Sequence, residues 1–294
     1  MPVYIPCGLP AKEFLEKENI VLTDKQDGRN NVGSLKIAIL NLMPFKIETE
    51  TDLLRIISNS PLHIDIDLIA PDSHKSKNTP AEHIQKFYTN FSKISECRYD
   101  GLIVTGAPVE HLDFESVDYW DEFLRILDWA RTSVKSSLFI CWAAQAALYR
   151  YYGINKYPLN KKMFGIFEHR LNDPLNPLFR GFDDVFFAPH SRHTEIRREE
   201  IEKTPELGIL SESDKAGVYI VQTLNRREIF VTGHSEYPPE TLNNEYCRDL
   251  SKNLPIEMPQ NYYLDDNPEN QPLTRWRSHA NLLFLNWLNY FVCD

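Results

Sequence analysis

The segment SSLFICWAAQAALYRYYG, residues 136–153, changes from one kind of secondary structure to another. Residues 137–141 are a short apolar run that predicts a buried strand, and the alanine-rich run after it predicts a helix. Cys141 lies at the junction of the two. Because ligands of open α/β sheets bind at the carboxyl ends of strands, Cys141 is the first candidate for a functional residue.

Strands and helices alternate over the residues that precede this segment. Strands are predicted at 34–43, 63–70 and 99–108, and helices at 48–60, 78–94 and 117–133. In the helix at 78–94 we expect Thr79 as the N-cap, Pro80 at the first helical position and Glu82 completing a capping box. Alternation from residue 34 to 153 predicts an α/β fold with a mostly parallel sheet and helices on both faces.

The second half of the chain has a different pattern. Short strands with little helix between them are predicted at 164–171, 183–190, 207–213, 217–224 and 227–237, which indicates an antiparallel extension of the sheet. Helices follow at 238–253 and 278–292, around an ordered, Pro/Asn/Asp-rich excursion at 254–276. We expect a single domain, 1–294, with its core at about 34–253, an N-terminal arm at 1–33 and a C-terminal extension at 254–294.

Composition restricts the classes of function. The 294 residues carry a net charge of −10, with basic residues dispersed along the chain. This disfavours nucleic acid or an anionic membrane as a partner. The N-terminus lacks a signal-peptide pattern and no apolar run is long enough to span a bilayer, so we expect a cytoplasmic protein. GxGxxG and P-loop motifs are absent, which leaves nucleotide binding without support.

The cysteine and histidine patterns predict neither a disulfide framework nor a metal site. Five cysteines are scattered without a CxxC pair, so we expect free thiols. His190 and His193 lack the supporting ligands that a zinc site requires.

Cys141 is either a nucleophile or a buried packing residue, and its position alone does not decide between the two. A tight turn from strand to helix holds a side chain above the sheet and directs the helix dipole at it. For a nucleophile at this position we expect a lowered thiol pKa.

The segment FVTGHSEY, residues 230–237, supplies partners for a nucleophilic cysteine. His234 and Glu236 are two residues apart, so on an extended segment they point the same way. The carboxylate then orients the imidazole toward a thiol, as in a catalytic triad. Alone the pair would be an ordinary solvated strand end, but with Cys141 it indicates a Cys–His–Glu site.

A third feature is VTGAP, residues 104–108, which follows a predicted strand beside that of Cys141. The backbone N–H groups of Gly106 and Ala107, with that of Trp142, are placed to form an oxyanion hole for a tetrahedral intermediate. An ordinary Gly-Ala-Pro turn is compatible with the same geometry.

Motifs along nearly the whole chain resemble one family. They are LKIAILNLMP (35–44), ETETDLLRIISNSPL (48–62), NTPAEHIQKFY (78–88), DGLIVTGAPVE (100–110), CWAAQAALY (141–149), FAPHSRHTE (187–195), TGHSEY (232–237) and RWRSHANLLFLNWLNY (275–290). With the Cys–His–Glu pattern, they are similar to the homoserine O-acyltransferases, the homoserine O-succinyltransferase or homoserine trans-acylase family of methionine biosynthesis. This family is part of the flavodoxin-like class I glutamine amidotransferase-like superfamily. Glutaminases there carry G-x-C-x-G; Phe139 and Ala143 replace those glycines here, which disfavours a glutaminase.

The resemblance implies ping-pong acyl transfer. Cys141 takes the acyl group from an acyl-CoA as a thioester, and the hydroxyl of L-homoserine, deprotonated by His234, then accepts it. The CoA ester is a co-substrate, and no other cofactor is expected. The family implies a homodimer, for which the apolar helix at 278–292 is a candidate interface.

The resemblance also implies the residues around the substrate. Arg248 would bind the carboxylate of homoserine and Glu245 its ammonium, with Arg192 nearby. Lys162 and Ser191 match positions around the substrate, and Lys46 matches a lysine near the active site.

Glu110 bears on the choice of acyl donor. It follows the predicted oxyanion loop, where its carboxylate can reach the far end of an acyl group on Cys141. A succinyl carboxylate about 4 Å away would be repelled by about 4 kcal/mol at an effective dielectric near 20, whereas acetyl is uncharged. Members resembling this chain with Glu at the matching position transfer acetyl, and those with Gly transfer succinyl. We therefore expect acetyl-CoA as donor.

Three alternatives stay open. Glu110 could be a solvated loop residue that points away from Cys141. The acyl donor could also be succinyl-CoA, which Glu110 would then not repel. The chain could also be a noncatalytic superfamily member with a vestigial thiol.

Overall fold

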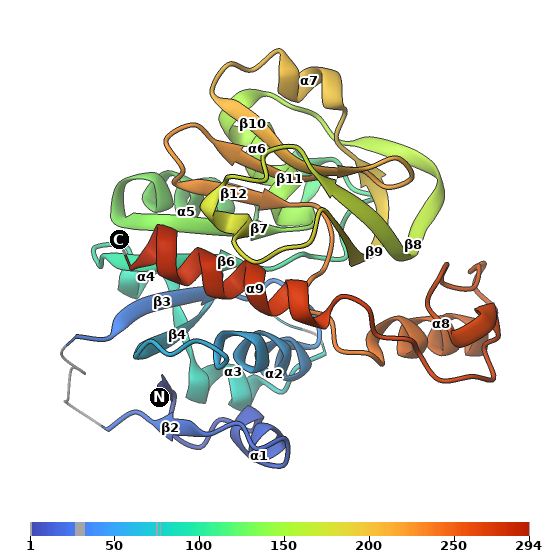
Figure 1. Cartoon of the computed structure of the whole chain (residues 1–294). Coiled ribbons are helices and arrows are strands. Elements are labelled where there is room, and N and C mark those ends of the chain that lie inside the picture. The colour runs from blue at the N-terminus through green and yellow to red at the C-terminus, as the bar shows by residue number, and fades with distance from the viewer. Residues whose placement is uncertain (1, 27–32, 75, 77, 294) are drawn as a thin grey trace.

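The computed structural model describes residues 2–26, 33–74, 76 and 78–293. Within this part of the chain, twelve strands form one mixed sheet that helices cover on both faces (Figure 1). The strand order along its main path is β2-β1-β4-β3-β6-β7-β12-β11-β10-β8-β9. The α/β class and the combination of parallel core and antiparallel extension are confirmed.

Parallel strands form the centre of the sheet. They are β4 (Ile64–Ala70), β3 (Leu35–Leu40), β6 (Tyr99–Val104), β7 (Val134–Ile140) and β12 (Glu228–Val231), each parallel to its neighbour. Most of their residues are buried apolar side chains, which is typical of a sheet covered on both faces. The strands that the sequence predicts up to Cys141 are therefore present, as β3, β4, β6 and β7.

Two pairs of helices cover the two faces. α2 (Lys46–Ile57) and α9 (Arg277–Trp287) pack into one apolar core, and α5 (Trp120–Ser133) and α6 (Trp142–Tyr152) into the other. α6 ends at Gly153, whose φ of 69° is the left-handed conformation that commonly closes a helix. Beyond α9 the chain continues as a π-helical turn, Leu288–Val292.

The antiparallel extension consists of four strands beside β12. They are β11 (Gly217–Thr223), β10 (Leu207–Ser213), β8 (Tyr157–Leu171) and β9 (Val185–Glu195), with the short helix α7 (Arg198–Glu202) between β9 and β10. The predicted strand at 227–237 is shorter than expected. β12 ends at Val231, so the triad candidates lie in the loop after it.

The N-terminal segment, expected as an arm, adds strands to the sheet. β1 (Val3–Ile5) pairs parallel to β4, and β2 (Leu22–Asp24) pairs parallel to β1, with α1 (Ala11–Glu16) between them. Val3, Ile5 and Leu15 are buried, because the edge of the sheet next to β4 needs an apolar cover.

The predicted capping box at Thr79 is wrong. α3 (Ala81–Phe87) follows Pro80, and no side chain caps it. The Thr79 hydroxyl instead donates to the Pro44 carbonyl at 3.0 Å and accepts from the Lys46 N–H at 3.2 Å. The hydroxyl therefore stabilises the loop that leads into α2 and does not cap α3. The predicted helix is also interrupted by β5 (Tyr88–Asn90), which pairs with β4, before α4 (Phe91–Ile94).

The segment between α8 (Thr241–Ser251) and α9 is an ordered excursion, as predicted, and lies beside the body of the molecule with α8 (Figure 1). Tyr262 and Tyr263 are buried and anchor it, and Gln260 forms a bridge with Gly165 of β8. Three short 3-10 turns complete the described elements: Phe114–Ser116, Pro177–Phe179 and Leu264–Asp266.

The apolar residues of α9 lie mainly inside the chain. Leu283, Phe284 and Trp287 are buried against the sheet of the same chain, and the Trp287 indole donates to the Ser136 hydroxyl at 3.0 Å. The helix at 278–292 therefore packs mainly within its own chain, and its role as a dimer interface stays a prediction.

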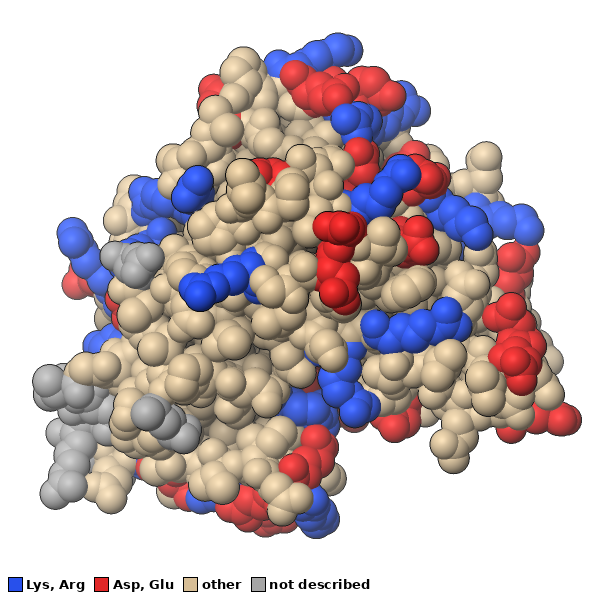
Figure 2. Space-filling view, viewed as in Figure 1, with Lys and Arg blue, Asp and Glu red and all other residues tan. Residues whose placement is uncertain are grey.

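Acidic and basic side chains are interspersed on the face of the molecule that Figure 2 shows. Within the described residues, no helix combines the length and the apolar character needed to cross a membrane.

Candidate active site

Cys141 lies in a strained turn between β7 and α6. Its φ of 50° and ψ of −114° are rare for a residue with a side chain, and such strain occurs at functional turns. Its N–H donates to the Val231 carbonyl of β12 at 2.7 Å. Phe139 and Ala143, which replace the glycines of the glutaminase motif, are fully buried, and the Phe139 ring stacks on Phe230. The nucleophile elbow therefore forms through packing, without flanking glycines.

His234 and Glu236 meet Cys141 as the triad pattern predicts. The Glu236 carboxylate lies 2.7 Å from His234 Nδ1, which leaves Nε2 as the ring nitrogen for the thiol. The Tyr237 ring stacks on the imidazole, with centroids 4.1 Å apart. A Cβ added to Gly106 would lie 3.3 Å from Cys141 Cβ and 3.4 Å from His234 Cε1, so the VTGAP loop needs its glycine for this close approach.

The expected lowering of the Cys141 pKa is wrong. Burial raises the pKa of this thiol, because the side chain is 3% exposed and a thiolate is poorly solvated there. The charge of His234 and its hydrogen bond act in the opposite direction, and the Glu110 carboxylate raises the pKa further. Burial also lowers the pKa of His234, but Cys141 and Glu236 outweigh it and raise that pKa well above its usual range. The thiolate thus depends on a protonated His234 beside it.

A cavity of about 510 Å³ opens onto Cys141 and His234. It brings together predicted residues from four separate segments of the chain. These are Ala107, Glu110, Lys162, Ser191, Glu245 and Arg248. The cavity is large enough for a small substrate.

Glu245 is the centre of the polar wall of this cavity. It accepts from Lys162 Nζ at 2.6 Å and from the Ser191 hydroxyl at 2.8 Å, and Arg248 Nη2 lies 3.6 Å from it. Arg248 is also held by Asp249 at 2.7 Å. Four of the residues that the resemblance assigns to the substrate are therefore one cluster.

Glu110 points at the nucleophile. Cys141 Sγ lies 3.7 Å from Glu110 Oε1, while Glu110 Oε2 accepts from the His193 N–H at 2.8 Å. Lys156 Nζ fixes the loop by donating to the Glu110 carbonyl at 2.6 Å. The alternative of a solvated loop residue that points away is excluded by these contacts.

Ala107 lines the cavity, and Trp142 is the first residue of α6, directly after Cys141. The Trp142 side chain is fully buried among aromatic rings, which fixes the start of the helix. The oxyanion hole formed by their N–H groups stays a prediction.

Arg192 and Lys46 do not line the cavity. Arg192 is 1% exposed, with its guanidinium donating to carbonyls behind the site, so its predicted place around the substrate is wrong. Lys46 Nζ donates to the carbonyls of Asn41 and Met43, and burial lowers its pKa to about 8. Lys46 therefore acts near the active site only by holding the loop between β3 and α2, whose residues 43–45 line the cavity.

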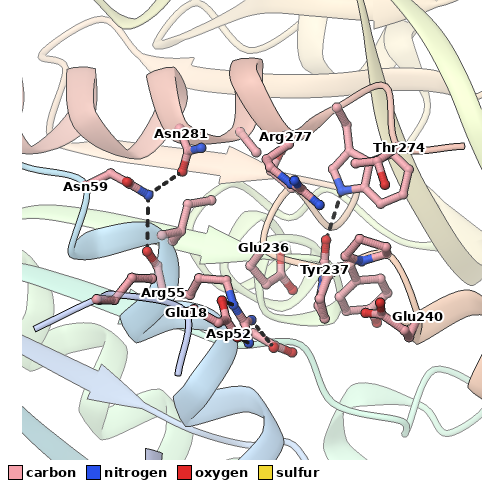
Figure 3. Close-up of a pocket in the computed structure, with 17 residues that line it drawn as sticks. Glu18, Asp52, Arg55, Asn59, Glu236, Tyr237, Glu240, Thr274, Arg277 and Asn281 are labelled. Carbon is pink, nitrogen blue, oxygen red and sulfur yellow. Dashed lines mark hydrogen bonds and ion pairs between the residues drawn. The ribbon is translucent and has the colours of Figure 1, made fainter. Parts of the chain in front are cut away.

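A second cavity, of about 410 Å³, lies behind the triad (Figure 3). Glu236, Arg277 and Trp276 line it, and Asp52 and Tyr237 line both cavities and so separate them. Glu236 Oε2 has no hydrogen-bond partner within the described residues. No sequence pattern indicates Asp52 or Tyr237 as members of the site, because their position depends on α2 and the β12 loop meeting.

Asp52 is the carboxylic acid that lies between the two cavities. Burial raises its pKa to about 7, and the charges of Glu236 and Glu48 add to the rise, while its 2.8 Å hydrogen bond from Arg55 opposes it. A carboxyl with a raised folded-state pKa stabilises the fold when protonated. This stabilisation is complete below the unfolded pKa of 3.8 and is lost as the pH rises through about 7.

We therefore expect Asp52→Asn to gain stability relative to the wild type as pH rises. Asparagine does not titrate, so the difference in unfolding free energy should move in favour of the variant by at most about 3 kcal/mol between pH 5 and pH 8. Urea unfolding at several pH values measures this. Glu13→Gln, which removes an exposed carboxylate of α1 that does not act on the pKa of Asp52, is the control. A difference that does not change with pH would contradict the assignment.

Within the described residues, no group of three or more His, Cys, Asp or Glu side chains is arranged to hold a metal ion.

The fold and the site define a class of protein: a glutamine amidotransferase-like fold with a buried cysteine beside a His–Glu pair. A glutamine amidotransferase from Thermotoga maritima superposes with a TM-score of 0.55 at 13% identity, over 87% of this chain and 97% of the other. A glutamine amidotransferase from Methylobacillus flagellatus gives 0.53 at 11% identity, over 88% and 95%. At these identities the likeness concerns the fold alone.

The particular family follows from the sequence comparison. The family model described as homoserine O-succinyltransferase matches residues 2–294, and the chain belongs to this family. A homoserine O-acetyltransferase from Bacteroides fragilis is 61% identical over 293 residues, 99% of this chain and 96% of that one. Proteins with the same name are 58% identical in Acetivibrio thermocellus, over 99% and 96%, and 55% identical in Desulfitobacterium hafniense, over 99% and 95%.

Proposed function

We propose that the protein transfers an acetyl group from acetyl-CoA to the hydroxyl of L-homoserine. The observation that carries this proposal is the carboxylate of Glu110, 3.7 Å from the Cys141 sulfur. The names of the relatives, which specify O-acetyl transfer, support it. The role in methionine biosynthesis follows from the family.

The first half of the reaction makes an acyl-enzyme. The Cys141 thiol gives its proton to His234, and the sulfur attacks the carbonyl of acetyl-CoA. The oxyanion of the tetrahedral intermediate is stabilised by the N–H groups of Ala107 and Trp142. When the intermediate collapses, the bond to the CoA sulfur breaks, and CoA leaves with the proton from His234. Glu236 holds the imidazole and stabilises its cation.

The second half regenerates the thiol. Homoserine binds with its carboxylate on Arg248 and its ammonium at Glu245, the cluster that Lys162 and Ser191 complete. His234 takes the proton of the homoserine hydroxyl, whose oxygen attacks the thioester. The ester then leaves, and the Cys141 sulfur recovers its proton from His234. No cofactor besides the CoA ester takes part. The homodimer and the cytoplasmic location stay predictions.

Donor choice depends on charge at Glu110. A succinyl group on Cys141 places a second carboxylate near Glu110, and two charges about 4 Å apart repel by about 4 kcal/mol at an effective dielectric near 20. This energy corresponds to roughly a thousandfold discrimination. Acetyl carries no such charge and is short enough for the space beside Glu110.

We expect the wild type to release CoA from acetyl-CoA in a homoserine-dependent way and to use succinyl-CoA roughly a thousandfold less well. Glu110→Gly should gain succinyl transfer. Glu110→Gln keeps the size of the side chain and removes its charge. It therefore distinguishes charge repulsion from lack of room as the cause of the discrimination. The measurement is kcat/KM for each CoA ester, with the product identified by mass.

Three results would contradict the proposal. Preference for succinyl-CoA in the wild type would make the protein a succinyltransferase. No gain of succinyl use in either Glu110 variant would remove Glu110 from donor selection. No homoserine-dependent release of CoA from either ester would favour the noncatalytic alternative.

A further inference from the structure

Arg192 is a buried cation, and among the described residues no carboxylate forms an ion pair with it. Its Nη1 donates to the Thr194 carbonyl at 2.6 Å, its Nη2 to the Ala216 carbonyl, and its Nε to His190 Nδ1 at 3.3 Å. All three acceptors are neutral. Burying a charge without a paired counterion is costly, by several kcal/mol even after relaxation. A buried arginine in this state needs an opposite charge within electrostatic range.

Two neutral histidines complete the hydrogen bonding of Arg192. His169 Nδ1 donates to the Phe167 carbonyl at 2.9 Å, so its Nε2 carries the lone pair. His190 Nε2 lies 3.0 Å from that nitrogen and must donate to it. His190 Nδ1 is then the acceptor that Arg192 Nε needs. The Phe167 carbonyl therefore fixes the tautomer of His169, and His169 in turn fixes the tautomer of His190 that accepts from Arg192.

Both imidazoles stay uncharged. Burial lowers the pKa of His169 to about 3, and burial together with the charge of Arg192 lowers the pKa of His190 well below its usual range. The two rings therefore fix the position of the guanidinium without adding or removing charge.

Two of the three negative charges that act on Arg192, Cys141 and Glu110, lie in the active site. Burial lowers the pKa of Arg192, while the negative charges of Cys141, Glu195 and Glu110 raise it. Reciprocally, the charge of Arg192 lowers the pKa of Cys141. The Arg192 strand is also tied to the triad, because the His234 N–H donates to the Pro189 carbonyl at 2.9 Å.

The contact between these two segments is close. A Cβ added to Gly233 would lie 2.8 Å from the Pro189 carbonyl oxygen and 2.9 Å from His190 Cε1. Ser191 and His193, the strand neighbours of Arg192, line the cavity, so the Arg192 side chain lies on the other face of β9.

We propose that Arg192 is a positioning residue for the reaction, whose fixed positive charge stabilises the Cys141 thiolate beside the Glu110 carboxylate and is kept in place by the neutral pair His190 and His169. The charge offsets the destabilisation that burial and Glu110 impose on the thiolate. This inference rests on the proposed acyl transfer for its purpose, but the thiolate is measured without that reaction.

The test is the pH dependence of Cys141 alkylation by iodoacetamide, quantified on the Cys141 peptide by mass spectrometry. The peptide readout is required because the other four cysteines are exposed. In Arg192→Met we expect the midpoint of alkylation to rise, because a positive charge that favours the thiolate is lost, and the rise should be smaller than the opposite shift in Glu110→Gln. Arg192→Lys, which retains the charge, should stay close to the wild type. Glu110→Gln should move the midpoint in the opposite direction, downward.

Two controls make the result specific. Arg170→Met removes an exposed arginine from the neighbouring strand β8 and should leave the midpoint unchanged. Other titratable groups at the cavity, including His234, His193, Lys162, Asp52 and Tyr237, are common to all variants. Far-UV circular dichroism verifies folding. If Arg192→Met is unfolded, Arg192→Gln, which keeps a hydrogen-bond donor for the buried carbonyls, takes its place.

A folded, uncharged variant with an unshifted midpoint would overturn the inference and leave Arg192 as a packing residue. Equal upward shifts in Arg192→Lys and Arg192→Met would overturn it too, because geometry and not charge would be responsible. If the wild type does not transfer acetyl but the variants show the expected midpoint shifts, the proposed function is contradicted and the inference on the thiolate stays intact.

Discussion

Cys141→Ala should abolish acyl transfer, with kcat reduced by about 10⁴-fold or more, because the sulfur forms the covalent intermediate. Wild-type protein given acetyl-CoA without homoserine should gain the mass of one acetyl group on the peptide that contains Cys141. The variant should gain none. Steady-state CoA release and intact-protein mass spectrometry measure the two effects.

Cys247→Ala is the matched control, since Cys247 is exposed on α8 and its sulfur lies 3.8 Å from the Asn243 side-chain oxygen, away from Cys141. This variant should keep both activity and the adduct. Substantial turnover by Cys141→Ala would mean that homoserine attacks acetyl-CoA directly and that the covalent mechanism is wrong. An adduct on another cysteine would mean that this residue, and not Cys141, is the nucleophile.

His234→Asn should lower kcat by about 10²–10⁴-fold, the usual contribution of a general acid–base group. Asparagine can still accept or donate a hydrogen bond toward Glu236, but it cannot carry a proton between the thiol and the leaving group. Both half-reactions use this proton, so acylation measured by the adduct and transfer to homoserine should each slow down.

Glu236→Gln should impair turnover less than His234→Asn. The amide still contacts His234 Nδ1 at the 2.7 Å position but loses the charge that stabilises the imidazolium. Steady-state kinetics of both variants decide the ranking. Near-normal rates in both would mean that the pair is a strand end without a catalytic role, and a more severe effect of Glu236→Gln would mean that orientation dominates over proton transfer.

The sequence by itself determined the central parallel strands and the candidate residues of the triad. Apolar runs of strand length alternate with helical periodicity from residue 34 to 153, and this short-range pattern is sufficient for a parallel sheet. The junction of strand and helix indicates Cys141, and the His-x-Glu spacing indicates His234 with Glu236, although the two lie in the turn after β12 and not on extended chain. Glu245, Arg248, Lys162 and Ser191 came from resemblance, since nothing in their local spacing connects them.

Only the tertiary structure decided burial and charge environment. Arg192 and Lys46 carry charges that sequence reasoning assigned to the active site, yet their charged ends bind carbonyls inside the fold. Thr79 matches a capping pattern, but the loop before α2 takes its hydroxyl. The pKa of Cys141 is raised and not lowered, because burial and Glu110 outweigh the opposite effects of His234 and Arg192. Periodicity and turn chemistry act between neighbours in sequence, whereas solvation and electrostatic interactions depend on segments that are distant in sequence and meet only in the folded chain.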